Sequence, residues 1–145
     1  MVLFVDDEKR VMDSYSLELV LCGYDVRFET KVDMALKFFE DNIRAIQLLV
    51  LDIMMPAGES LNNASPLSGL RTGVVFYKKI RAQVPELPVV ILTNVTDASV
   101  EEFFINENHC WFLRKVDYLP FEFAAEIQRI APLPAAQNER KKKEE

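Results

Sequence analysis

The chain is poor in the side chains that most often carry out nucleophilic catalysis or bind soft metals. It has one histidine and two cysteines among 145 residues. His109 alone cannot form a histidine-based catalytic pair or a site with several histidine ligands. Cys22 and Cys110 lie apart, each within an apolar stretch, and the N-terminus lacks a signal-peptide pattern. We therefore expect reduced, buried thiols and a cytoplasmic protein.

The chain also lacks an excess of positive charge and any long apolar run. Its net charge is −6, whereas a surface that binds nucleic acid needs a basic face. The one basic cluster, Arg140–Lys143, is followed by two glutamates, which is typical of a solvated tail. No apolar stretch reaches the roughly 18 residues of a membrane span. We therefore expect neither nucleic acid nor a membrane as a partner.

What the chain does have is enough apolar material for one domain, since half of its residues are hydrophobic. Pro132 and Pro134 are expected to stop a last helix. The predicted organisation is a domain over residues 1–131 and a charged C-terminal tail or linker over 132–145.

Four short apolar runs each end in a polar side chain. The runs are Val2–Val5, Leu48–Leu51, Val89–Leu92 and Cys110–Leu113. Continuous apolar runs of this length predict strands buried on both faces, as in a parallel sheet covered by helices. Tyr24–Phe28 is predicted to be a further short strand.

Helical periodicity separates these predicted strands. The first helix is predicted to turn inward the residues Val11, Tyr15, Leu19 and Cys22, with Gly23 after its end. Thr72 and Asp97 are expected to begin two later helices as caps. Five alternating strand–helix units predict an α/β fold, with a parallel five-stranded sheet and helices on both faces.

The polar groups at the strand ends are expected to meet, because ligands of such sheets bind at the carboxyl ends of the strands. These groups are Asp6, Asp7, Asp52, Thr93 and Lys115. Three carboxylates in one pocket repel one another, so a cation is needed, and Mg²⁺ prefers oxygen ligands. Asp52 can then act as a nucleophile toward a phosphoryl group. Lys115 would neutralise the transferring oxygens, and Thr93 would donate a hydrogen bond to one.

Each of these residues alone also has an ordinary structural interpretation. An acidic pair after a strand is common at a helix N-terminus. Asp52 before a Met-Pro pair fits a loop, Thr93 fits a helix cap, and Lys115 fits a solvated lysine. Their joint occurrence at strand ends, in this order, favours the phosphoryl site.

Over residues 2–131 the chain resembles the receiver domain of two-component response regulators. The segments that match are Leu3–Glu8, Leu49–Pro56, Pro88–Thr93 and Phe112–Lys115. The resemblance implies a flavodoxin-like (βα)5 three-layer sandwich with strand order 2-1-3-4-5. It also implies Mg²⁺ (or Mn²⁺) as cofactor and a sensor histidine kinase or histidine phosphotransfer protein as phosphodonor.

The resemblance also implies a role for each matching residue. Asp52 is the expected phosphoacceptor, Asp7 a direct metal ligand, Asp6 a member of the acidic pocket, the Met54 backbone carbonyl a third protein ligand, Thr93 the switch hydroxyl, Lys115 the phosphate-binding lysine and Phe112 the switch aromatic. Thr93 is expected to swing toward a bound phosphoryl group, which lets Phe112 rotate inward. That movement would change the surface of the fourth helix, fifth strand and fifth helix, which a downstream protein or output domain reads.

Three features depart from the family pattern. Val116 follows Lys115 in place of the usual proline, so this peptide bond is either a strained cis bond or trans in a rearranged loop, and we expect trans. The loop at about residues 53–70 is unusually long, which fits a lid, a kinase-recognition element or an insertion without a role. Asn94 and Met54 stand near the phosphoacceptor, and neither is expected to activate water, so we predict slow self-hydrolysis.

Two alternative functions remain open from the sequence. An aspartyl-phosphate phosphohydrolase would need a second acid two residues after the nucleophile, where this chain has Met54. A pseudo-receiver would bind partners without being phosphorylated, and Val116 and the long loop leave room for it. The favoured function is a phosphorylation-dependent signalling switch that assists its own modification without being an enzyme.

Overall fold

The computed structural model describes residues 1–54 and 69–134 of the chain. These residues form β1 (Val2–Val5), α1 (Lys9–Leu21), β2 (Val26–Glu29), α2 (Val32–Asp41), the 3-10 turn η1 (Ile43–Ala45), β3 (Leu48–Leu51), α3 (Gly69–Gln83), β4 (Val89–Thr93), α4 (Ala98–Ile105), β5 (Cys110–Arg114), the 3-10 turn η3 (Lys115–Asp117) and α5 (Pro120–Ile130). Most of the loop that we expected at about residues 53–70, and most of the predicted tail, lie outside the described residues.

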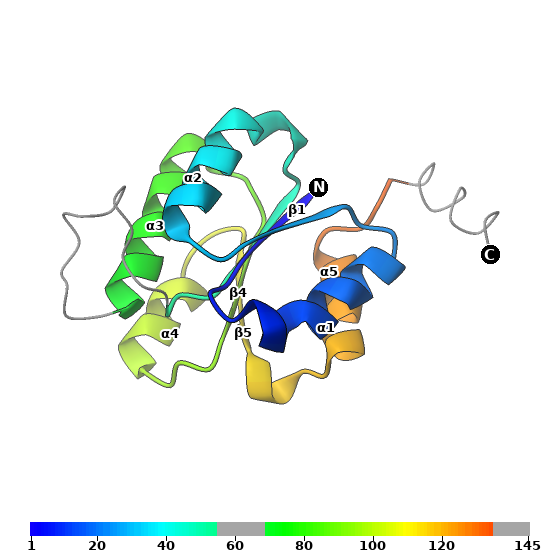
Figure 1. Ribbon diagram of the computed structural model, residues 1–145. Helices are drawn as coiled ribbons and strands as arrows, with labels where there is room; N and C mark the ends of the chain where they lie inside the picture. Colours follow the sequence, from blue (N-terminus) through cyan, green and yellow to red (C-terminus); the bar gives the residue numbers. More distant parts are fainter. Residues whose placement is uncertain (55–68, 135–145) are drawn as a thin grey trace.

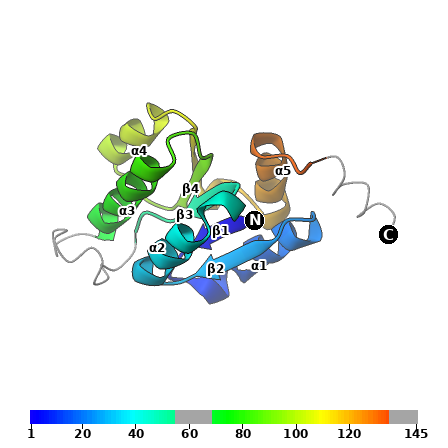
Figure 2. The same cartoon turned by 90° about the horizontal axis from the view of Figure 1, so that it is seen from above.

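The five strands form one parallel sheet in the order β2-β1-β3-β4-β5. The helices α2, α3 and α4 cover one face of the sheet, and α1 and α5 cover the other (Figure 1). Figure 2 shows the same three layers from above. The predicted fold class and strand order are therefore confirmed.

The sheet is buried on both faces because its strands alternate their side chains between two hydrophobic cores. In β1, Leu3 and Val5 belong to the core under α2, α3 and α4, whereas Val2 and Phe4 belong to the core under α1 and α5. The same alternation places Leu48 and Val50 of β3 under α1 and α5. A continuous apolar run thus contributes side chains to both hydrophobic cores.

Helix α1 ends as the sequence predicts, at a glycine in a left-handed conformation. Gly23 has φ 107°, and its N–H donates to Val20 O at 3.0 Å. The next amide, Tyr24 N, donates to Leu19 O at 3.0 Å. This pair of hydrogen bonds is the Schellman pattern, and only glycine adopts such a φ without a steric cost.

The start of α3 differs from the prediction. Thr72 was expected to cap this helix, but α3 begins at Gly69 and Thr72 lies inside it, 1% exposed. Leu70 and Arg71 are good helix formers, so the helix extends one turn further toward the N-terminus than the cap signal indicated.

One glycine in α3 lets the helix approach the chain segment after β3. A Cβ built on Gly73 would lie 2.1 Å from Ile53 O and 2.3 Å from Ile53 Cα. Ile53 is itself fully buried and follows Asp52 directly. The absence of a side chain at residue 73 therefore fixes how closely α3 packs on the segment that holds Asp52.

Within the described part of the chain, no helix is both long enough and apolar enough to cross a bilayer.

Candidate phosphoacceptor site

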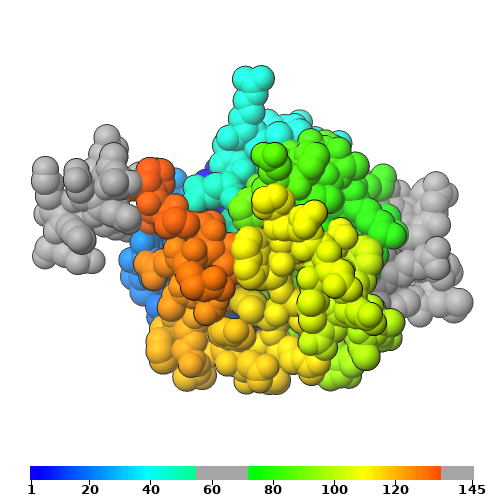
Figure 3. All heavy atoms as spheres, turned by 180° about the vertical axis from the view of Figure 1, so that it is seen from behind, coloured from blue at the N-terminus to red at the C-terminus, as the bar shows by residue number. Residues whose placement is uncertain are grey.

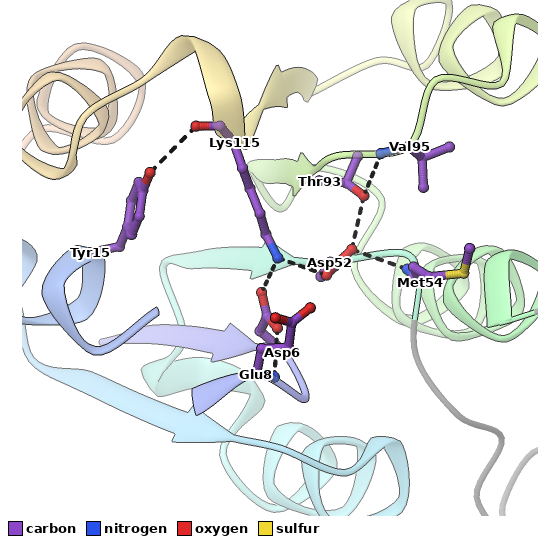
Figure 4. Close-up of polar contacts among 8 residues, drawn as sticks. All are labelled: Asp6, Glu8, Tyr15, Asp52, Met54, Thr93, Val95 and Lys115. Carbon is purple, nitrogen blue, oxygen red and sulfur yellow. Dashed lines mark hydrogen bonds and ion pairs between the residues drawn. The ribbon is translucent and has the colours of Figure 1, made fainter. Parts of the chain in front are cut away.

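The site lies at the carboxyl edge of the sheet, where four strands end beside one another. Asp6 and Asp7 follow β1, Asp52 follows β3, Thr93 ends β4 and Lys115 follows β5. The register pairs Val5 with Leu51 and Thr93 with Arg114, so the residues after these pairs are neighbours. The parallel topology thus brings together all five residues that the sequence placed at strand ends. Figure 4 shows four of them, Asp6, Asp52, Thr93 and Lys115.

Asp52 is the most heavily contacted of these side chains and is 4% exposed. Its Oδ1 accepts hydrogen bonds from Thr93 Oγ1 at 2.9 Å and from the Met54 N–H at 3.1 Å. Its Oδ2 accepts a hydrogen bond from Lys115 Nζ at 2.9 Å. The carboxylate is held in one orientation by a hydroxyl, an amide and an ammonium.

Lys115 lies between two carboxylates. Its Nζ is 2.9 Å from Asp52 Oδ2 and 2.9 Å from Asp6 Oδ2, and its side chain is 9% exposed. Burial lowers the pKa of the Lys115 ammonium, but the hydrogen bonds and charges of Asp6 and Asp52 outweigh burial and raise the pKa overall. Lys115 therefore remains a cation at neutral pH.

One ammonium does not neutralise the acidic cluster beside it. Oxygens of Asp6, Asp7 and Asp52 lie within 4.8 Å of one another. Burial is the main factor that raises the pKa of Asp6, although a hydrogen bond from the Glu8 N–H opposes it. Partial burial and then the charge of Asp52 raise the pKa of Asp7, although this residue as a whole is exposed. The charge of Asp52 is among the causes that raise both pKa values, so the three carboxylates disfavour one another's charged forms and a cation would relieve this repulsion.

The cluster has the chemistry of a divalent-cation site. Apart from the ion pair with Lys115, the buried Asp6 Oδ2 has no hydrogen-bond donor among the described residues. Asp6, Asp7 and Asp52 offer only oxygen atoms, which suits Mg²⁺ or Mn²⁺ better than softer metals. Met54, whose carbonyl was expected as a further ligand, lies on the wall of the same cavity.

A cavity of about 520 Å³ opens over the acidic cluster. Its wall consists of Asp7, Glu8, Asp52, Met54, Thr93, Asn94, Val95, Thr96, Asp97 and Lys115. Met54 is 48% exposed at this cavity, beside Asn94. Both residues that we expected near the phosphoacceptor are thus at its entrance. The segment from Val95 to Asp97 was not predicted to line the site, and it does so because it connects β4 to α4.

Thr93 and Phe112 lie in different surroundings. Thr93 is fully buried, donates to Asp52 and accepts a hydrogen bond from the Val95 N–H at 3.3 Å. Phe112 is partly buried, and its ring stacks on Phe104 with centroids 6.3 Å apart. The Thr93 hydroxyl thus contacts the Asp52 carboxylate directly, and its swing toward a bound phosphoryl group, with the rotation of Phe112, stays a prediction.

The segment after Lys115 is a 3-10 turn with trans geometry. No cis peptide bond occurs among the described residues, so the expected trans bond between Lys115 and Val116 is confirmed. Tyr15 of α1 donates a hydrogen bond to Tyr118 O at 2.7 Å, and its hydroxyl lies 3.4 Å from Lys115 O. The sequence placed Tyr15 only on the inward face of a helix, and no motif signalled this contact.

Comparison with known proteins finds relatives by structure. No family model matches the chain, and no curated protein matches it. Among solved structures, a CheY-like response regulator receiver domain protein from Methanospirillum hungatei JF-1 matches with a TM-score of 0.71 and 19% identity, over 99% of this chain and 97% of that chain. The receiver domain of NtrX from Brucella abortus matches with a TM-score of 0.69 and 26% identity, over 90% and 97%.

A third structure is the non-phosphorylated HemR receiver domain from Leptospira biflexa, with a TM-score of 0.73 and 21% identity, over 92% of this chain and 94% of that chain. The matches thus cover nearly the full length of each protein. The chain has the fold of response regulator receiver domains, with an acidic cluster that could bind metal at the carboxyl edge of its sheet. The resemblance stated from the sequence is confirmed.

Proposed function

We propose that this protein is a phosphorylation-dependent signalling switch of a two-component phosphorelay, with Asp52 as the phosphoacceptor. The observation that supports it most is the setting of the Asp52 carboxylate. One oxygen contacts the Thr93 hydroxyl, the other contacts the Lys115 ammonium, and two more carboxylates lie alongside. The fold adds support, since the neighbours by structure are receiver domains of signalling proteins rather than enzymes of metabolism.

The proposed reaction transfers a phosphoryl group from a phosphohistidine on a sensor histidine kinase or histidine phosphotransfer protein. An Asp52 oxygen forms a bond to phosphorus as the phosphorus–nitrogen bond of the donor breaks and the imidazole leaves. Lys115 and Thr93 each contact an Asp52 oxygen, which supports a role in which they contact oxygens of the transferring group and stabilise their negative charge. The protein assists this transfer but is itself the acceptor, so we do not class it as an enzyme.

Asp6, Asp7, Asp52 and the Met54 carbonyl would hold a divalent cation, which we propose to be Mg²⁺, with Mn²⁺ as a substitute. When bound, the cation supplies positive charge to phosphoryl oxygens. Lys115 pairs with two of the three carboxylates at the site, so the cluster has more acidic groups than this one ammonium can balance, and a cation would offset the rest.

We propose the α4–β5–α5 face as the output surface. Figure 3 shows α4, β5 and α5 side by side on one face of the molecule. Large apolar side chains are exposed at the end of α4 and between β5 and the first turn of α5, namely Ile105, Val116, Leu119 and Phe121, each at least 58% exposed. Arg114 of β5 pairs with Glu101 of α4 at 2.6 Å, which ties this face to the strand that ends at Lys115. A downstream protein or output domain would recognise a change at this face.

We propose that residues 1–131 act as the receiver unit and that 132–145 form a tail or linker. We also propose a cytoplasmic location, since ATP-dependent phosphodonors act there and both cysteines are thiols. The proposal includes no contact with nucleic acid, in keeping with the net charge of −6.

The test is incubation of the protein with Mg²⁺ and acetyl phosphate, followed by intact-mass measurement. We expect addition of one phosphoryl group to the native protein and none to Asp52→Asn. A pseudo-receiver would gain no mass under these conditions. A phosphohydrolase would release phosphate repeatedly, and the absence of an acid at Met54 argues against it.

A further inference from the structure

The turn that carries Lys115 has weak support of its own. The hydrogen bond that closes it, from Tyr118 N to Lys115 O, is long at 3.4 Å. Val116 is 78% exposed and Asp117 is also exposed, so neither packs against a core. Val116 also leaves its φ angle free, where a proline would fix it. Of the turn residues, Tyr118 packs against the core under α1 and α5, so the backbone of the turn is supported from that side.

Tyr15 of α1 adds to that support. Its hydroxyl donates to Tyr118 O at 2.7 Å and also lies 3.4 Å from Lys115 O, so it contacts both ends of the turn. A hydroxyl has one proton, so the short contact is the main hydrogen bond. The Tyr15 ring packs edge-on against Phe123 of α5, with centroids 5.6 Å apart, which fixes the direction of the hydroxyl.

The same helix also begins beside the other partner of Lys115. Asp6 accepts a hydrogen bond from the Glu8 N–H at 2.9 Å, and Glu8 is the residue directly before α1. Tyr15 lies about two turns further along α1, or roughly 10 Å. Helix α1 therefore acts as a rigid spacer between Asp6 and the turn that carries Lys115. Lys115 Nζ and Asp6 Oδ2 lie 2.9 Å apart (Figure 4).

We infer that Tyr15 is a positioning residue for Lys115: its hydroxyl fixes the 115–118 turn to α1 and so directs the Lys115 ammonium between Asp6 and Asp52. Its effect on the rate of phosphoryl transfer rests on the proposed function, whereas its effect on the placement of the ammonium does not. Tyr15 itself does not contact the phosphoacceptor.

The chain contains a matched control for this hydroxyl. Tyr24 donates to Ala131 O at 2.7 Å and lies 3.4 Å from Ile127 O, at the far end of α5. Tyr24→Phe thus removes a hydrogen bond of the same type and length, also to a backbone carbonyl, away from the site. If both hydroxyls were purely structural, Tyr15→Phe and Tyr24→Phe would have the same effect on the phosphorylation rate and on the Lys115 ammonium.

The experiment compares native protein, Tyr15→Phe and Tyr24→Phe by two measurements. The first is the rate of phosphorylation by acetyl phosphate with Mg²⁺, which we expect Tyr15→Phe to lower by about three- to tenfold and Tyr24→Phe to leave unchanged. The second is the Lys115 ammonium signal in NMR without divalent cations. Ammonium protons held by carboxylates exchange slowly with water, so this signal should persist in native protein and Tyr24→Phe and broaden in Tyr15→Phe.

Equal rates and equal ammonium signals in the two variants would overturn the inference. If the native protein accepts no phosphoryl group, the proposed function fails, and the ammonium signal alone decides the role of Tyr15. A slower rate in Tyr15→Phe with an unchanged ammonium signal would also contradict it, because the effect would then not pass through Lys115.

Discussion

Substitution of Gly73 by alanine tests whether the packing of α3 on the segment that holds Asp52 sets the geometry of the site. The new Cβ would lie 2.1 Å from Ile53 O, 2.3 Å from Ile53 Cα and 2.5 Å from Ile53 C. All three are backbone atoms of a fully buried residue, so no flexible side chain can move aside. Either α3 or the segment after β3 must shift by roughly 1 Å to restore ordinary contact distances.

The shift has two expected consequences of different size. Overpacking of a buried site costs typically 1–3 kcal/mol, so we expect Gly73→Ala to lower the free energy of unfolding by about 2–3 kcal/mol. A misplacement of about 1 Å at a reacting group can cost about 100-fold in rate. Because Asp52 precedes Ile53 directly and holds contacts of 2.9 Å to Thr93 and Lys115, we expect phosphorylation to slow by at least about tenfold.

Urea unfolding measures the first effect, and the rate of mass gain with acetyl phosphate measures the second. The matched control is Ile80→Val, which removes one methylene from a fully buried side chain further along α3. Ile80→Val should lower the free energy of unfolding by about 1 kcal/mol without slowing phosphorylation of the folded protein. If Gly73→Ala reacts at the native rate, the packing of α3 does not set the position of Asp52, and this reasoning is wrong.

Three further predictions concern the acidic cluster, the turn before β5 and the entrance of the site. Asp7→Asn should stabilise the metal-free protein at neutral pH. The pKa of Asp7 is raised in the folded protein, so the loss of stability caused by its charge is absent below about pH 4 and grows as pH rises through the folded pKa. Measurement of Tm with EDTA and with Mg²⁺ checks this, and a lower Tm of the variant in EDTA would contradict it. His109→Gly should raise the free energy of unfolding by about 0.5–1 kcal/mol in urea, since His109 has φ 55°, and a loss of stability would refute the strain. Met54→Asp should shorten the lifetime of the phosphoryl group at least about tenfold by orienting water, whereas Met54→Leu and the native protein should lose it slowly; rapid loss from the native protein would contradict this.

The sheet and the site were predictable because they depend on short, unambiguous signals. Each central strand is a continuous apolar run, and a parallel topology then forces the residues after those runs to one edge. Asp52, Thr93 and Lys115 therefore come together by register alone, with contacts of 2.9 Å. The cap at Asp97 was also predicted from the sequence, and the structure confirms it, because the Asp97 side chain accepts hydrogen bonds from Ser99 N and Val100 N.

Other features depend on tertiary contacts that leave no local signal. Val11 fits the apolar periodicity of α1, yet it is 61% exposed, because Met12 occupies the core position. The hydrogen bond of the Tyr15 hydroxyl and the close approach of Ile53 to Gly73 involve partners 103 and 20 residues away in the chain. The start of α3 was misplaced because a cap residue within a helix looks the same in sequence as one at its end.

The central claim is that Asp6, Asp7, Asp52, Thr93 and Lys115 form one site in which a divalent cation enables Asp52 to accept a phosphoryl group. The most direct measurement is peptide mapping of the phosphoryl group after reaction with acetyl phosphate, in Mg²⁺ and in EDTA. The account predicts modification at Asp52 alone, with Mg²⁺ and not with EDTA. Modification elsewhere, or equal modification in EDTA, would contradict it.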